Sequence, residues 1–123
     1  MARVDATQGL QGHAFQALCR LLDDARFHVK VSGIDRVNEK LPLDVPPYPR
    51  GIELAAYLVR TFPAQCLWGT DWPHPNHTHI PDDGVLVQAL TDIAPTPLLL
   101  QQLLVDNPQA LYRFSPLTSL HTP

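Results

Sequence analysis

The sequence predicts an α/β fold built on two parallel strands, at about residues 27–32 and 65–69, which are joined by a helix. The first strand segment alternates apolar and polar residues, and the second is a short apolar run that ends abruptly at Gly69. A proline-rich polar stretch follows each segment. A strand, a crossover helix and a second strand within about 40 residues form a βαβ unit, in which the strands are parallel and the crossover is right-handed.

Helices are predicted where apolar residues recur every three or four positions. The helix ahead of the first strand is the clearest, since Phe15, Leu18 and Leu22 share one face, and the residues before it are expected to be irregular. Asn107, followed by Pro108, is predicted to end one helix and to cap the next. We expect helices at about residues 12–24, 51–62, 83–93, 97–105 and 108–113.

Size and composition restrict the class of protein. The 123 residues suffice for one ordinary domain, whereas a closed (β/α)8 barrel needs about 250. A hydrophobic content of 45% with 17% charged residues is typical of a globular chain. A net charge of −3 without a basic run predicts that the protein binds neither nucleic acid nor a membrane. Cys19 and Cys66 are predicted to be free thiols of a cytoplasmic protein.

The strongest motif is Leu-Trp-Gly-Thr-Asp-Trp-Pro-His-Pro-Asn at residues 67–76, where the second strand ends. Asp71 follows the strand directly, at the end of a parallel sheet where ligand sites are usually found. Pro73 and Pro75 each favour extended backbone at the residue before them, which includes His74. A carboxylate held in such a loop is a candidate general base or metal ligand, and the alternative is a simple loop cap.

Arg36 stands in the corresponding place after the first strand, within Ser-Gly-Ile-Asp-Arg. A guanidinium at a strand end can hold a carboxylate through two parallel hydrogen bonds. Because the carboxyl ends of parallel strands meet at one edge, we expect Arg36 and Asp71 to face the same substrate. The alternative is a solvated loop arginine that pairs with Asp35 or Glu39.

Three histidines follow the aspartate. His74 lies inside the motif, three residues after Asp71, and is a candidate substrate-binding residue. His77 and His79 are predicted to be solvated loop residues rather than metal ligands. A small metal-binding module made of Asp71 and these three histidines is a further possibility.

The run Trp-Gly-Thr-Asp-Trp-Pro-His-Pro-Asn resembles the last-strand motif of the amidohydrolase-related family, described as metal-dependent hydrolases with a TIM-barrel fold. Within that family it is most similar to the 2-pyrone-4,6-dicarboxylate lactonase branch. The likeness extends from residue 1 to about residue 114 and leaves residues 115–123 as a tail. It implies that residues 1–114 are the C-terminal part of a (β/α)8 barrel.

The resemblance also implies a chemistry, namely the hydrolysis of a lactone, ester or amide of a cyclic carboxylic acid. Asp71 would be the catalytic aspartate and could also bind a zinc-like divalent metal, which some branches of the family use and others do without. Arg36 would hold the carboxylate of the small-molecule substrate.

An alternative prediction is that the chain has this fold but no catalytic activity of its own. The family's active-site histidines on its first and sixth strands have no counterpart in this sequence. The chain alone is therefore expected to be an inactive fragment or a small interaction module, which self-associates through its uncovered sheet edges.

Overall fold

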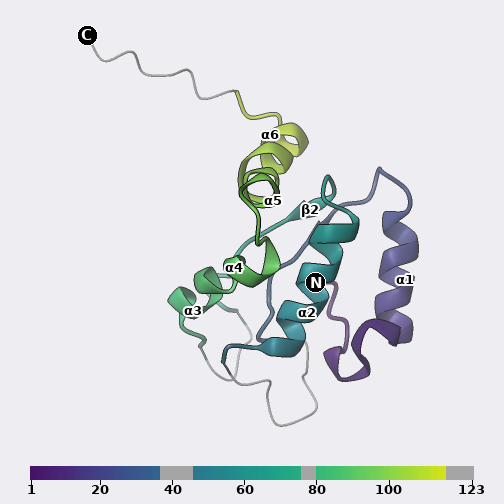
Figure 1. Ribbon diagram of the computed structural model, residues 1–123, viewed down its shortest axis with the longest axis vertical. Coiled ribbons are helices and arrows are strands. Elements are labelled where there is room, and N and C mark those ends of the chain that lie inside the picture. Colours follow the sequence, from purple (N-terminus) through teal and green to yellow (C-terminus); the bar gives the residue numbers. More distant parts are fainter. Residues whose placement is uncertain (37–45, 76–79, 116–123) are drawn as a thin grey trace.

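The computed structural model describes residues 1–36, 46–75 and 80–115, so that most of the expected tail lies outside the described residues. Its elements are arranged as Figure 1 shows. Within the described ranges, no helix is both long enough and apolar enough to cross a bilayer. In chain order the elements are the 3₁₀ turn η1 (Ala6–Gln11), α1 (His13–Leu22), β1 (Val29–Lys30), α2 (Pro49–Thr61), β2 (Cys66–Leu67), α3 (Asp83–Gln88), α4 (Leu90–Ile93), α5 (Pro97–Gln101), the π-helical turn η2 (Gln102–Asp106) and α6 (Asn107–Tyr112).

β1 and β2 form a two-stranded parallel sheet in which Val29 pairs with Cys66. The N–H of Val29 donates to the carbonyl of Gln65 at 2.9 Å, and the N–H of Val31 donates to that of Leu67 at 2.7 Å. The predicted parallel βαβ unit is therefore confirmed. The strands are shorter than the sequence pattern indicates, because ladder pairing covers only part of each extended segment.

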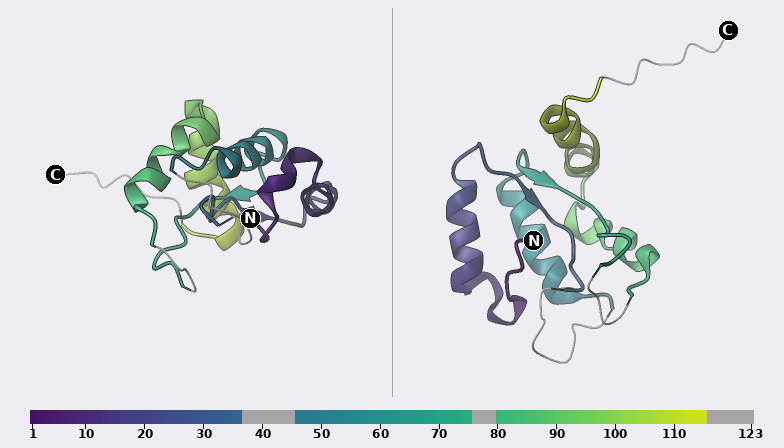
Figure 2. Two further views of the ribbon diagram at one scale, coloured as in Figure 1. Left: turned by 90° about the horizontal axis from the view of Figure 1, so that it is seen from below. Right: turned by 180° about the vertical axis from the view of Figure 1, so that it is seen from behind.

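α2 is the crossover helix and covers one face of the sheet (Figure 2). Its inward side chains Leu54, Leu58 and Val59 are at most 1% exposed. Full burial of such a side chain contributes about 1.5–3 kcal/mol. The helix begins close to the end of β1, since a Cβ on Gly51 would lie 2.1 Å from the carbonyl oxygen of Ile34. This close approach sets the position of the loop that follows β1.

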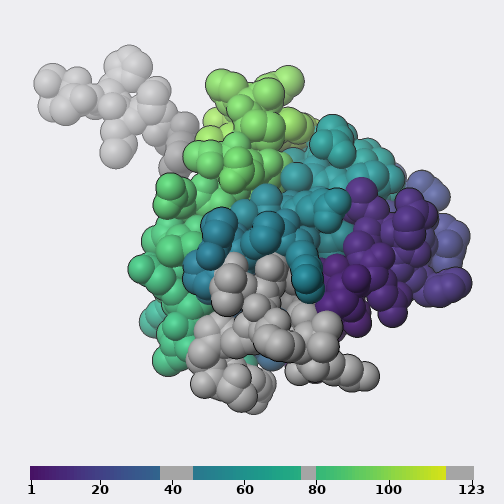
Figure 3. Space-filling model, turned by 60° about the horizontal axis from the view of Figure 1, so that its bottom comes forward, coloured from purple at the N-terminus to yellow at the C-terminus, as the bar shows by residue number. Residues whose placement is uncertain are grey.

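The N-terminal residues lie against α2. Residues 1–5 form no helix or strand, as expected, whereas residues 6–11 form the 3₁₀ turn η1, and there the expectation of irregular backbone is wrong. The 3₁₀ turn η1 contacts α2, and Asp5 caps the turn by accepting a hydrogen bond from the N–H of Thr7 at 2.9 Å. Phe15 of α1 meets Tyr57 of α2 edge-on, with ring centroids 5.6 Å apart. Figure 3 shows these N-terminal residues lying beside α2.

The helix expected at residues 83–93 is instead two short helices, α3 and α4, which meet at Ala89. Ala89 has φ −60° and ψ −19°, a tighter turn than an α-helix uses. Leu86, Ala89 and Ile93 all remain buried, so the apolar side continues across the break.

Asn107 does not cap a helix, and this prediction is also wrong. Its φ of −66° and ψ of −48° are helical, and the chain runs from η2 into α6 without a stop. The ring of Pro108 would clash with the carbonyl four residues earlier in a regular α-helix. The π-helical turn avoids this clash by a wider bond, in which the N–H of Asn107 donates to the carbonyl of Gln102. The buried Asn107 amide donates instead to the carbonyls of Pro63, at 2.6 Å, and Cys66, at 2.8 Å.

Replacing Asn107 by leucine removes both of these donors at similar side-chain size. We expect the free energy of unfolding to fall by about 2–3 kcal/mol, because two carbonyls beside β2 lose their partner. Chemical denaturation measures this loss. Gln101→Ala removes an amide from an exposed position on the same helical stretch and should change stability by less than about 0.5 kcal/mol. Equal stability of the two variants would contradict the role of Asn107.

Cys19 and Cys66 are free thiols, as predicted. Burial raises the pKa of the Cys66 thiol from 9.0 to about 12. Because the pKa is raised in the folded state, the neutral thiol stabilises the fold fully below about pH 9, and this contribution is lost as the pH rises toward 12.

In a Cys19→Ser variant at pH 8, we expect Cys66 to react with a thiol reagent only as fast as the protein unfolds. The absorbance of the released chromophore gives the rate. The same variant in denaturant should react at once, and equal rates with and without denaturant would show that Cys66 is accessible in the fold.

Candidate active site

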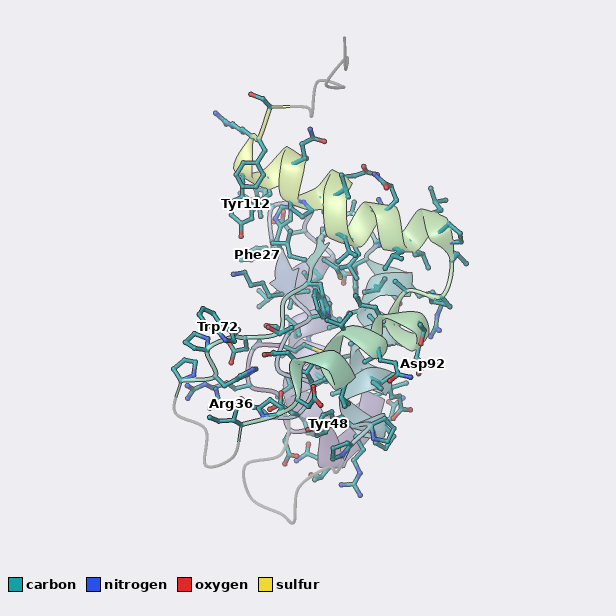
Figure 4. The ribbon with its side chains drawn as sticks, turned by 90° about the vertical axis from the view of Figure 1, so that its left-hand side faces the viewer. Phe27, Arg36, Tyr48, Trp72, Asp92 and Tyr112 are labelled. Carbon is teal, nitrogen blue, oxygen red and sulfur yellow. The ribbon has the colours of Figure 1, made fainter. Side chains whose placement is uncertain are left out.

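The loops that leave β1 and β2 lie on the same side of the molecule, as the labelled Arg36 and Trp72 show in Figure 4. After β1, the chain turns at Gly33, whose φ of +67° disfavours other residues, and the N–H of Arg36 donates back to the carbonyl of Gly33 at 3.0 Å. This turn directs Arg36 toward the loop after β2.

The loop after β2 is a tight turn rather than an extended segment. The N–H of His74 donates to the carbonyl of Asp71 at 2.7 Å, and the N–H of Trp72 donates to Oγ1 of Thr70 at 3.2 Å. Asp71 and His74 have φ values of 70° and 61°, so extended backbone at His74 is ruled out. Pro75 favours extended backbone at His74, but the hydrogen bond from His74 to Asp71 that closes the turn outweighs this preference.

Arg36 and Asp71 meet across the two loops. Their Nη1 and Oδ2 atoms are 3.6 Å apart, which is an ion-pair contact longer than a hydrogen bond. Arg36 Nη1 also donates to the carbonyl of Pro75 at 3.5 Å. The Arg36 side chain is 23% exposed and that of Asp71 is 38% exposed, so solvent reaches both groups. The expected meeting of these two residues is confirmed.

The Met1 nitrogen lies beside the chain that leaves β1. It donates to the carbonyl of Ser32 at 2.9 Å. Burial is the main cause that lowers the pKa of this amino group, while the negative charge of Asp71 acts in the opposite direction.

His74 points toward α3. Its side chain is 1% exposed, and its Nε2 lies 2.9 Å from Oδ1 of Asp83, the first residue of that helix. Its proposed contact with substrate stays a prediction. Asp83 is a site residue that the sequence reasoning missed. The only signal was the pair of acids at the start of α3, where Asp82 alone caps the helix by accepting from the N–H of Gly84 at 2.7 Å.

The described residues include no group of three or more histidine, cysteine or acidic side chains placed to hold a metal ion. Asp71 contributes one carboxylate beside a guanidinium, and this set does not fit a metal centre by itself. His77 and His79 lie outside the described residues.

Residues 1–114 match the amidohydrolase family. The chain belongs to this family. Among its relatives, it is 40% identical over 121 residues to a 2-pyrone-4,6-dicarboxylate hydrolase of Comamonas testosteroni, covering 91% of this chain and 39% of that protein. It is 35% identical over 113 residues to a 4-sulfomuconolactone hydrolase of Hydrogenophaga intermedia, covering 89% and 36%.

A solved structure agrees with this assignment to the amidohydrolases. The fold is similar to a Pseudomonas putida protein described as a 2-pyrone-4,6-dicarboxylic acid hydrolase, with a TM-score of 0.73 and 30% identity over 92% of this chain and 41% of that one. The two parallel strands and their helices are thus a segment of an amidohydrolase barrel. The chain spans about 39% of the length of its Comamonas relative, and the Comamonas and Hydrogenophaga relatives are named as hydrolases, the second of a lactone.

Proposed function

We propose that this chain carries the catalytic base and the carboxylate anchor of a lactone hydrolase. The observation that carries the proposal is the 3.6 Å separation of Arg36 Nη1 and Asp71 Oδ2 at the carboxyl ends of two paired parallel strands. One group accepts protons and the other binds anions, and both are open to solvent. A substrate that carries an ester bond beside a carboxylate matches this pair.

Lactone hydrolysis needs a base at the point where water attacks. The water oxygen adds to the ring carbonyl carbon while its proton passes to a carboxylate oxygen of Asp71. The tetrahedral oxyanion then collapses, the ring C–O bond breaks, and the proton returns from Asp71 to the leaving oxygen. The ring opens to a hydroxy acid and the carboxylate of Asp71 is restored.

Arg36 gives the site its preference for an acidic substrate. Its side chain is 23% exposed, and a planar guanidinium can hold a substrate carboxylate through two parallel hydrogen bonds. The Comamonas relative, 40% identical, is named for a dicarboxylate, and this supports the substrate class.

The role of Asp71 is tested in a chimaeric barrel, in which the Comamonas relative supplies the part of the barrel that this chain does not match. Residues 1–114 replace the matched portion of the Comamonas protein, and loss of the pyrone absorbance follows ring opening of 2-pyrone-4,6-dicarboxylate. We expect Asp71→Asn to lower kcat by about 10²–10⁴-fold, since the base is lost while the shape is kept. Asp92→Asn, at an exposed position on α4, is the matched control. Unchanged turnover in Asp71→Asn would overturn the proposed role.

Replacing Arg36 by methionine in the same chimaeric barrel should raise KM about 10–100-fold, because a charge-assisted contact contributes about 1.5–3 kcal/mol. Steady-state kinetics with 2-pyrone-4,6-dicarboxylate give the value. The exposed Arg26→Met is the control and should leave KM unchanged. A normal KM in the Arg36→Met enzyme would contradict the proposal that Arg36 binds the substrate carboxylate.

A further inference from the structure

His74 is buried and hydrogen-bonded, and the proposed hydrolysis assigns it no role. Its side chain is 1% exposed, and Nε2 lies 2.9 Å from Oδ1 of Asp83. Since a carboxylate only accepts hydrogen bonds, Nε2 donates. Asp83 is not needed to cap α3, because the neighbouring Asp82 already does so. The carboxylate of Asp83 is therefore available to hold the imidazole.

The backbone of His74 connects this bond to the site. Its N–H donates to the carbonyl of Asp71 at 2.7 Å, and Asp71 and His74 both have positive φ values. The next residue, Pro75, offers its carbonyl to Arg36 at 3.5 Å. A movement of the imidazole would thus displace two groups that contact Arg36, the Asp71 carboxylate and the Pro75 carbonyl.

We propose that Asp83 is a positioning residue, which acts through His74 to keep the Asp71 carboxylate and the Arg36 guanidinium in their relative positions. This role rests on the proposed function of those two residues. Asp83 lies at the start of α3, whose Leu86 is packed in the core, so it provides a fixed point outside the loop. The hydrogen bond between His74 and Asp83 supports the turn without using the Asp71 carboxylate or the Arg36 guanidinium.

The first test uses the full chain and requires no activity. Hydrogen exchange of the His74 amide reports its bond to Asp71. We expect Asp83→Ala to speed this exchange at least 10-fold, and Asp83→Asn, which keeps an accepting oxygen, to restore it to within about 3-fold of the unsubstituted chain. Asp82→Asn is the control, since it removes an equal charge from the same turn and keeps the cap.

A second variant distinguishes loss of the bond between His74 and Asp83 from a general loss of folding. His74→Asn tolerates the positive φ and lacks the ring, so it should exchange as fast as Asp83→Ala, and adding Asp83→Ala to it should have no further effect. Slow exchange in Asp83→Ala, or equally fast exchange in Asp83→Asn and Asp83→Ala, would overturn the proposal.

The chimaeric barrel then separates this proposal from the proposed function. Asp83→Ala should lower kcat about 10-fold or more with little change in KM, and Asp83→Asn should restore most of it. A barrel that folds but has no activity in the unsubstituted form would count against the proposed function, while the exchange result would still decide whether Asp83 holds the loop. Normal kcat in Asp83→Ala, with fast exchange, would show that the loop moves without consequence and would overturn the positioning role.

Discussion

The parallel pairing of β1 with β2 is the constraint on which the candidate site depends. Because α2 returns the chain to the start of the sheet, both strands end at the same edge, and their loops bring Arg36 to within 3.6 Å of Asp71. An antiparallel pair would send the two loops to opposite ends of the sheet. The close contact of Gly51 with the Ile34 carbonyl ties α2 to the first of these loops, so that the helix also places the site.

The outer edges of this small sheet are met by groups that do not belong to a strand. Beside β2, the Asn107 amide donates to the carbonyl of Cys66, and beyond β1 the Met1 amino group donates to the carbonyl of Ser32. Edge carbonyls without a partner are costly when they are buried. The Asn107 side-chain amide therefore satisfies a carbonyl of β2 that a neighbouring strand would satisfy in a larger sheet.

Local sequence patterns predicted the two parallel strands, the helices α1 and α2 and the main pair of the site, but not η1 or the break between α3 and α4. Apolar periodicity predicted α1 and α2, and the βαβ pattern predicted that Arg36 and Asp71 lie at the same edge of the sheet. Two interpretations failed because another contact outweighed the preference that the sequence indicated. Asn107 has the residue type and the following proline of a helix cap, but its amide bonds to chain more than 40 residues away. His74 precedes a proline, but the turn bond to Asp71 requires a positive φ.

The loop that carries Asp71 is held against the preference of its own backbone. Positive φ at Asp71 and at His74 costs about 1–2 kcal/mol for each residue. The ion pair with Arg36 does not offset this cost, because a partly exposed pair contributes between 0 and about 1 kcal/mol. The compensating contacts are the 2.7 Å bond from His74 to the Asp71 carbonyl and the bond of its buried ring to Asp83. Neither of these uses the Asp71 carboxylate or the Arg36 guanidinium. The loop that carries Asp71 is therefore supported by contacts that leave its carboxylate and the Arg36 guanidinium out of the supporting bonds.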